Sequence, residues 1–153
     1  MTCIVARVFL DTNILAYQFD GSEPDKQARV RQLLSGHEHS FSVSTQVLLE
    51  LYQVITRKLT PTVPPSAARQ VLTALAELAV VSADAQLVLR AAQTAEDDRL
   101  SIWDAMIIEA AAEAGCDEVW TEDLHTGVRL RGVEIVNPLR TTTQDPLKTR
   151  LRP

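Results

Sequence analysis

The sequence predicts an α/β fold in three layers, with a mostly parallel central sheet and helices on both of its faces. Two observations lead to this fold class. Short segments with strand character alternate along the chain with longer segments that have helical periodicity. Each helical segment is long enough to cross over one face of a sheet, which is the connection that parallel strands require. The length of 153 residues suits a single domain with its own core.

The first half of the chain alternates strand and helix signals. Residues 7–10 form a short β-rich run that ends at Asp11. Residues 24–34 begin with a proline and are followed by a glycine, as helices often are. Residues 40–44 (SFSVS) alternate in polarity, which is typical of a strand. Residues 45–58 carry apolar side chains at helical spacing and stop before a proline.

The second half continues the alternation. Residues 64–79 open with prolines and have helical periodicity, and a short strand is predicted at 80–81. Helices are predicted at 83–96 and at 101–114, and a glycine ends the second of them. The last two strands are predicted at 117–121 and 133–136.

Composition and charge narrow the class of protein. Hydrophobic residues make up 46% of the chain, as in globular domains, and no apolar run approaches the roughly 20 residues that span a membrane. The net charge of −5 argues against a general nucleic-acid binder but not against an enzyme that works through bound cations. Residues 141–153 are basic and lack apolar periodicity, so we expect a disordered tail after a domain of residues 1–140.

The cysteines indicate a cytoplasmic protein. Cys3 and Cys116 cannot form a disulfide framework, and residues 1–10 lack the pattern of a secretory signal. We expect both cysteines to be small hydrophobic side chains.

Two acids follow predicted strands. Asp11 comes directly after the strand at 7–10, and Asp123 comes two residues after the strand at 117–121. Open α/β sheets bind ligands at the carboxyl ends of their strands, so both acids are candidates for a reactive site. The alternatives are local. Asp11 could form an Asx turn or a helix N-cap, and Asp123 could be a turn residue, with its neighbour Glu122 as the functional acid instead.

Two further acids lie on apolar faces of predicted helices. Glu50 shares a helical face with Val47 and Val54, and Asp104 shares one with leucine, isoleucine and alanine side chains. A carboxylate in such a place costs several kcal/mol unless something charged pairs it. As alternatives, Glu50 could reach solvent or pair with an arginine, and Asp104 could complete a capping box with Ser101.

If the four acids meet, their charges must be neutralised. Like charges about 4 Å apart repel by roughly 1 to 4 kcal/mol per pair. Carboxylate oxygens select hard cations such as Mg²⁺ or Mn²⁺. Zinc is not expected, because His37, His39 and His125 are badly spaced and no cysteine pair joins them. Asp97 and Asp98 stand in a polar run and are expected to be solvated.

A hard cation held by carboxylates suits phosphoryl chemistry. It lowers the pKa of a bound water and stabilises charge on a phosphoryl oxygen, and two cations can hold both the attacking and the leaving oxygen. The sequence offers no set of serine, histidine and aspartate for nucleophilic catalysis and no glycine-rich phosphate loop.

Four short motifs occur in order along residues 6–139. They are FLDTN at 9–13, STQVLLE at 44–50, LSIWDA at 100–105, and TEDL at 121–124, which is followed by Gly127 and Asn137-Pro138. Together they resemble PIN domains, and specifically the toxin ribonucleases of VapBC toxin–antitoxin pairs.

The resemblance implies a set of site residues and an activity. The implied metal ligands are Asp11, Glu50, Asp104 and Asp123, with Thr12, Asn13 and Thr121 supporting the site through hydrogen bonds. The implied activity is that of a Mg²⁺- or Mn²⁺-dependent endoribonuclease that forms a homodimer and is blocked by a cognate VapB-like antitoxin. The preference for RNA over DNA rests on the resemblance alone.

Other functions fit the sequence less well. A phosphatase of the haloacid dehalogenase type needs a second acid where Asn13 stands, and a receiver domain needs a lysine at a strand end, which Lys26, Lys58 and Lys148 do not provide. A DNA-directed or flap-type nuclease carries segments beyond the core for which this chain has no room. Two alternatives stay open. The chain could be a PIN-fold binding module without nuclease activity, or a PIN nuclease in RNA processing.

Overall fold

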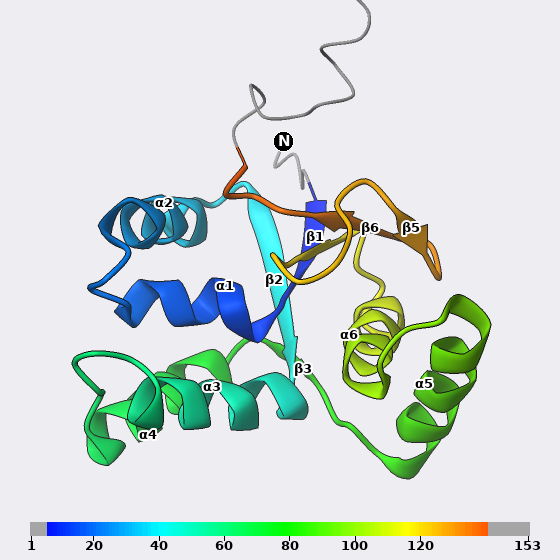
Figure 1. Ribbon diagram of the computed structural model, residues 1–153, viewed down its shortest axis with the longest axis horizontal. Coiled ribbons are helices and arrows are strands. Elements are labelled where there is room, and N and C mark those ends of the chain that lie inside the picture. The colour runs from blue at the N-terminus through cyan, green and yellow to red at the C-terminus, as the bar shows by residue number, and fades with distance from the viewer. Residues whose placement is uncertain (1–5, 141–153) are drawn as a thin grey trace, which may run out of the picture.

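A six-stranded sheet forms the centre of the molecule (Figure 1). The computed structural model describes residues 6–140. In chain order its elements are β1 (Ala6–Leu10), α1 (Thr12–Ala16), the 3-10 helix η1 (Tyr17–Phe19), α2 (Pro24–Ser35), β2 (His39–Ser44), α3 (Thr45–Arg57), α4 (Pro65–Leu75), β3 (Ala79–Val81), α5 (Ala85–Asp98), α6 (Ile102–Glu113), β4 (Glu118–Trp120), β5 (Arg129–Leu130) and β6 (Val133–Val136).

The order of the strands places β1 next to the point where the chain reverses direction across the sheet. The order is β3-β2-β1-β4-β6-β5, and every neighbouring pair is parallel except β5 and β6. The chain runs from β1 through β2 to β3 and then returns to the other side of β1 as β4. The carboxyl ends of β1 and β4 therefore meet where the strand order switches, which is where open α/β sheets bind their ligands.

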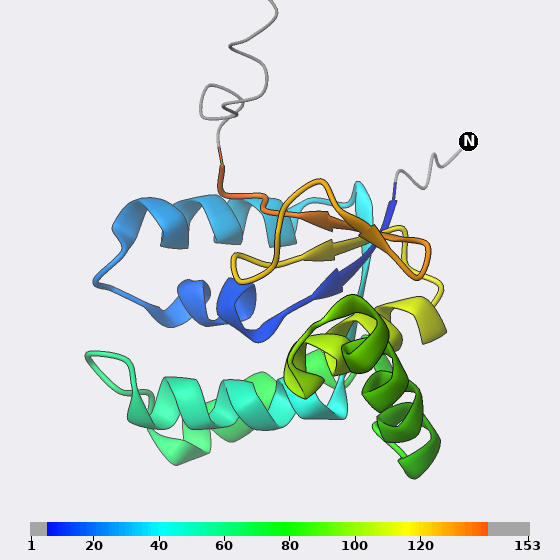
Figure 2. The same cartoon turned by 45° about the vertical axis from the view of Figure 1, so that its right-hand side comes forward.

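Helices cover both faces of the sheet, which confirms the three predicted layers. The first four α-helices lie on one side of the sheet, and α5 and α6 lie on the other (Figures 1 and 2). On the first side α1 packs against α3. On the second side α6 packs against β2, β4 and β6, while α5 packs mainly against α6. The mostly parallel sheet with helices on both faces is the fold class that the sequence predicts.

The hydrophobic core lies around β1 and α6. Val8, Phe9 and Leu10 of β1 are fully buried, as expected for a central strand that is covered on both faces. Residues 105–111 of α6 are all buried as well. This helix is buried around most of its circumference because α5 covers the side that faces away from the sheet.

All ten predicted elements are present, and the structure adds three short ones. These are α1, η1 and β5, each of which has five residues or fewer, too few to show a period of their own. The prediction for α4 is too long, because this helix ends at Leu75 instead of near residue 79. Apolar residues continue through the turn that follows, so the sequence pattern does not mark the end.

Two smaller predictions concern the cysteines and membranes. Cys116 is a buried free thiol, as expected, whereas Cys3 and the tail at 141–153 lie outside the described residues. No helix within residues 6–140 has the length and apolar character needed to cross a membrane.

Candidate active site

Asp11 lies at the junction of β1 and α1 and is only 7% exposed. Its Oδ1 accepts the backbone N–H of Thr12 at 2.7 Å, so that it caps the N-terminus of α1. Its Oδ2 accepts the hydroxyl of Thr121 at 2.8 Å, from the end of β4. The structure therefore combines the two interpretations of this residue, because the capping aspartate also faces the end of the neighbouring strand.

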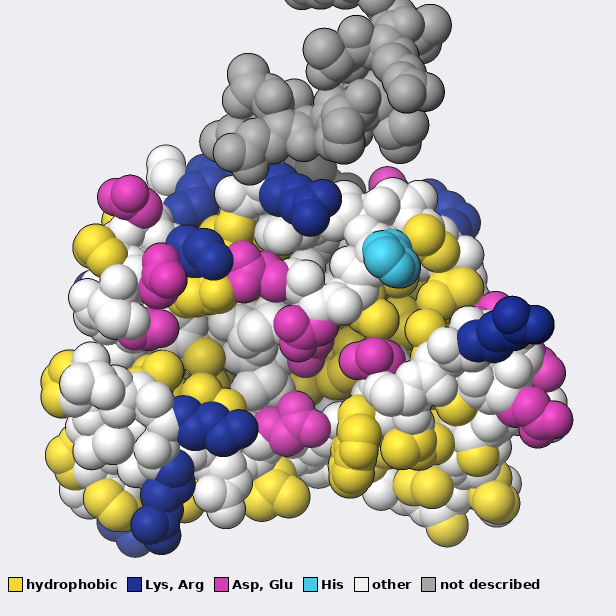
Figure 3. Space-filling model, in the orientation of Figure 1, with side chains coloured by type: hydrophobic (Ala, Val, Ile, Leu, Met, Phe, Trp, Pro, Cys, Tyr) yellow, Lys and Arg dark blue, Asp and Glu magenta, His cyan; other side chains and the backbone are white. Residues whose placement is uncertain are grey.

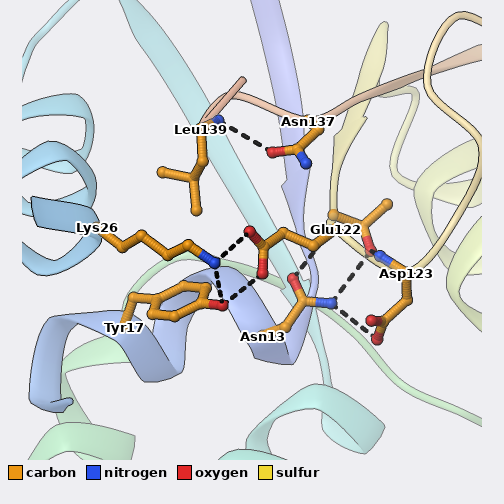
Figure 4. Close-up of polar contacts among 8 residues, drawn as sticks. Asn13, Tyr17, Lys26, Glu122, Asp123, Asn137 and Leu139 are labelled. Atoms are coloured by element: carbon orange, nitrogen blue, oxygen red, sulfur yellow. Dashed lines mark hydrogen bonds and ion pairs between the residues drawn. The ribbon is translucent and has the colours of Figure 1, made fainter. Parts of the chain in front are cut away.

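Asn13 joins the ends of β1 and β4 (Figure 4). Its side-chain nitrogen donates to Asp123 Oδ2 at 2.9 Å, to Thr121 Oγ1 at 3.2 Å and to Asp11 Oδ2 at 3.4 Å. Its side-chain oxygen accepts the backbone N–H of Glu122 at 3.3 Å. One amide thus lies between two of the predicted acids, whose chain positions are far apart.

Glu50 enters the same region from α3. The core face of this helix consists of Val47, Leu51 and Ile55, so Glu50 stands at the edge of the apolar stripe and not within it. Its Oε2 accepts the hydroxyl of Thr12 at 3.0 Å, and its Oε1 accepts the side-chain amide of Gln46 at 2.8 Å. Glu50 is therefore held by neutral donors and forms no ion pair with any residue from 6 to 140.

Asp104 occupies the first turn of α6. Ser101 caps this helix, and its hydroxyl oxygen accepts the backbone N–H of Asp104 at 3.1 Å, which is half of the predicted capping box. The carboxylate itself forms no hydrogen bond or ion pair with the described residues. It does not line the pocket that holds the other three predicted acids, although its neighbour Trp103 does.

A pocket of about 790 Å³ opens beside these residues. Asp11, Glu50 and Asp123 line it, and the apolar part of its wall includes Leu49 and Trp103. Figure 3 shows acidic side chains around a hollowed region near the centre of this face, with apolar and basic side chains next to them. The structure thus brings three of the four predicted acids to one cavity.

The electrostatics of the pocket centre on Asp11. Burial raises the pKa of its carboxyl from 3.8 to about 6. Hydrogen bonds from Thr121 and Thr12 act in the opposite direction, and the negative charges of Asp123 and Glu50 raise this pKa further. Since no lysine or arginine of the described chain forms an ion pair with Asp11, its negative charge is uncompensated.

The donor chemistry of the pocket fits a hard cation, although its acids are not gathered in advance. All of the candidate ligands are carboxylate oxygens, which Mg²⁺ and Mn²⁺ prefer. Within residues 6–140, however, no three His, Cys, Asp or Glu side chains are already grouped closely enough to hold a metal ion. The amide of Asn13 stands between Asp11 and Asp123 and takes part of the space between them.

Fold and pocket together define a class of protein, namely an α/β domain with a carboxylate pocket at the switch point of a parallel sheet. A family model described as PIN domain matches residues 8–126, and the chain belongs to the PIN domain family. The family predicted from the sequence motifs is thereby confirmed. No curated protein sequence matches this chain significantly.

Solved structures of toxins share the fold. A toxin–antitoxin complex from Klebsiella pneumoniae matches with a TM-score of 0.65 at 19% identity, over 88% of this chain and 99% of that one. The sarcin-ricin loop cleaving toxin VapC20 of Mycobacterium tuberculosis matches with a TM-score of 0.60 at 18% identity, over 76% and 91%. DNA-bound VapBC from Salmonella typhimurium matches with a TM-score of 0.56 at 24% identity, over 85% and 96%. At these identities the likeness establishes the fold.

Sequence reasoning missed several side chains around the pocket. Gln46 could have been found, because it stands four residues before Glu50 on one helix and such pairs face each other. Tyr17 and Lys26 carry no local signal. They contact Glu122 across 105 and 96 positions of the chain, and only the folded structure shows that they are neighbours.

Proposed function

We propose that this protein is a metal-dependent endoribonuclease and the toxin of a toxin–antitoxin pair. The observation that carries the proposal is the environment of Asp11. This acid is buried without a cation, lies beside two other acids, and lines an open pocket at the switch point of the sheet. A carboxylate kept in such a place is unfavourable for the free protein, which supports a requirement for a bound cation.

In this proposal Asp11, Glu50 and Asp123, which line the pocket, would hold Mg²⁺ or Mn²⁺. Asp104 would be the fourth ligand, supplied from the first turn of α6 beside Trp103, although it lies outside the lining of the pocket. When bound, the ion would lower the pKa of a water molecule and stabilise charge on the phosphoryl group. Thr12 and Thr121 orient the carboxylates of Glu50 and Asp11 through their hydroxyls. These residues keep both carboxylates aimed at the pocket in the absence of the ion.

Asn13 would reduce the electrostatic repulsion between two of the acids. Its amide donates to the carboxylates of both Asp11 and Asp123, and so reduces the repulsion between them. A cation would take over this neutralisation. Asn13 would keep Asp123 and the backbone of Glu122 in place through its hydrogen bonds.

The protein family and the relatives support a substrate and a partner for this proposal. One relative with this fold is described as cleaving the sarcin-ricin loop, which supports RNA as the substrate. Two others are a toxin–antitoxin complex and a DNA-bound VapBC, which supports a VapB-like antitoxin as partner. A homodimer and a cytoplasmic location are part of the same proposal.

A second candidate function is that of a PIN-fold binding module without nuclease activity. One observation favours it: within residues 6–140 the acids are not grouped closely enough to form a metal site. The two candidates differ in what a divalent cation does. It would switch on cleavage in a nuclease and would have no effect on a binding module.

The decisive experiment is cleavage of a panel of tRNA and rRNA fragments by the purified protein. The reaction is run with Mn²⁺ or Mg²⁺, with EDTA, and with the variant Asp11→Asn. Asp98→Asn is the matched control, because Asp98 is an exposed acid at the end of α5, away from the pocket. Cleavage that requires the cation and Asp11, but not Asp98, supports the nuclease. Equal cleavage by Asp11→Asn, or none by the wild type, favours the binding module.

A further inference from the structure

Tyr17, Lys26 and Glu122 form a cluster next to the candidate site (Figure 4). The ammonium group of Lys26 donates to Glu122 Oε1 and to the hydroxyl oxygen of Tyr17, each at 3.1 Å. The Tyr17 hydroxyl in turn donates to Glu122 Oε2. The same ammonium group lies 4.8 Å from the centre of the Tyr17 ring. Side chains from η1, from α2 and from the segment after β4 thus form hydrogen bonds with one another.

This cluster occupies both oxygens of Glu122. The side chains of Glu122 and Lys26 are 21% and 38% exposed, so their ion pair is partly shielded from water. Figure 4 shows that the side chain of Glu122 is directed toward Lys26 and Tyr17, whereas that of Asp123 is directed away from them. Of the two adjacent acids after β4, only Asp123 lines the pocket.

The backbone of Glu122 connects the cluster to the candidate site. Its N–H donates to the side-chain oxygen of Asn13, and the amide nitrogen of Asn13 donates to Asp123. Thr121, on the other side of Glu122, accepts the N–H of Asp123 at 3.1 Å and donates to Asp11 at 2.8 Å. The segment 121–123 lies beyond the end of β4 and lacks the support of a strand there. The contacts of Lys26 and Tyr17 with Glu122 therefore also restrict the positions of Thr121 and Asp123.

We propose that Lys26, Tyr17 and Glu122 are positioning residues that hold Asn13 and Asp123 in place for the reaction, and that Glu122 is an anchor and not a cation ligand. This inference rests on the proposed nuclease function. Charged and hydroxyl groups behind the ligands of a metal site commonly change metal affinity or activity by about 10- to 100-fold when they are removed.

The test compares three variants that keep the shape of the side chain. Lys26→Met removes the ammonium group, Tyr17→Phe removes the hydroxyl, and Lys26→Arg keeps a positive charge. For each we measure kcat and KM for RNA cleavage and, independently, the dissociation constant of Mn²⁺ by calorimetry. Arg29→Met is the matched control on the same helix, because Arg29 is exposed and its side chain bonds, among residues 6–140, only to Gln32 of α2.

We expect Lys26→Met to lower kcat and to weaken Mn²⁺ binding by about 10- to 100-fold, with KM nearly unchanged. Tyr17→Phe should have a smaller effect in the same direction, and Lys26→Arg should restore most of the loss. The melting temperature should hardly move in any of them, because a partly exposed ion pair adds little stability. A merely structural cluster would leave Mn²⁺ binding and kcat unchanged, whatever its effect on the melting temperature.

The opposite outcomes are distinguishable. If Glu122 is itself a cation ligand, Lys26→Met frees its carboxylate and Mn²⁺ binds more tightly, which overturns the inference. If the wild type cleaves RNA and binds Mn²⁺ but all variants equal it, the inference is also overturned while the proposed function stands. If the wild type neither cleaves nor binds Mn²⁺, the proposed function fails and the inference falls with it.

Discussion

Asp11 and Glu109 are both buried, at 7% and 2% exposure, yet only Glu109 has cations beside it. Glu109 lies on α6, where its Oε1 accepts the Thr94 hydroxyl at 2.6 Å and Arg131 Nε at 2.9 Å. Arg90 lies 3.9 Å from its other oxygen. Asp11 receives only neutral donors and faces two further acids.

The contrast separates an acid whose charge is compensated within the fold from an acid whose charge is not. The arginines beside Glu109 come from α5 and from the turn between β5 and β6, so this acid joins three parts of the chain. A buried carboxylate that is paired in this way is complete without a ligand. Asp11 lacks such a pair, and the energetic cost of its burial is removed only by a proton or by a cation.

The largest effect that tests this contrast is a loss of activity. Asp11→Asn keeps the shape of the side chain and removes its charge, so RNA cleavage should fall by about 1,000-fold. The melting temperature in metal-free buffer should not fall, because the repulsion from Glu50 and Asp123 disappears. Glu109→Gln should retain cleavage below its melting temperature. The contrast fails if Glu109→Gln abolishes cleavage in the folded protein or if Asp11→Asn retains it.

A large loss of stability is expected when Glu109 loses its arginine partners. Replacing both Arg90 and Arg131 by methionine leaves the charge of Glu109 buried without a cation, and should lower the free energy of unfolding by about 4 kcal/mol. Urea denaturation measures this change. Adding Glu109→Gln to the double variant should restore most of the stability. If the double variant is as stable as the wild type, the arginines do not compensate Glu109.

The pH dependence of stability should show the uncompensated charge of Asp11. Its pKa is about 6 in the folded protein and 3.8 in the reference state, so the folded form holds the proton more tightly. The stability that results is complete below pH 3.8 and is lost as the pH rises through 6, by about 3 kcal/mol in all. Relative to Asp11→Asn in metal-free buffer, the wild type should lose this amount between pH 4 and pH 7. Parallel stability curves for the two proteins would contradict the prediction.

The smallest expected effect is the stabilisation by a cation. At a Mn²⁺ concentration 100 times its dissociation constant, the wild type should gain about 2.7 kcal/mol of stability, because the ion binds only the folded form. The gain should be smaller at pH 5, where a proton competes for Asp11. Thermal melts with Mn²⁺ and with EDTA measure it, and Asp11→Asn should show almost no gain. An equal gain in that variant would place the cation elsewhere.

The fold could be predicted from the sequence because its signals are local. Strand runs, helix caps and the prolines and glycines at helix ends are all carried by neighbouring residues, and each of the ten predicted elements is present. The short hairpin strand β5 was not predicted, because two residues are too few to show an alternation of polar and apolar side chains. Its turn depends on the left-handed backbone of Arg131 and Gly132, at φ 53° and 77°, which the arginine does not signal.

The candidate site could be predicted only in part, because acids are recognisable along a sequence and their surroundings are not. The positions of Asp11 and Asp123 follow from the ends of β1 and β4. The amide of Asn13 between them, and the cations beside Glu109 and Glu122, come from residues distant in the chain. Glu109 shows the difference well. Like Asp104, it is a single acid within an apolar run of α6. Only the folded structure shows that nearby arginines pair with its carboxylate.

The hydrogen bond from Thr121 to Asp11 joins residues 110 positions apart, which has a consequence for the order of synthesis. A ribosome that adds 5 to 20 residues per second needs roughly 5 to 20 seconds to extend the chain from one to the other. During that time β1 has been made, but β4 has not yet docked beside it, and Asp11 lacks both Thr121 and Asp123. The candidate site therefore stays incomplete until residues 121–123 have been made and β4 has docked beside β1.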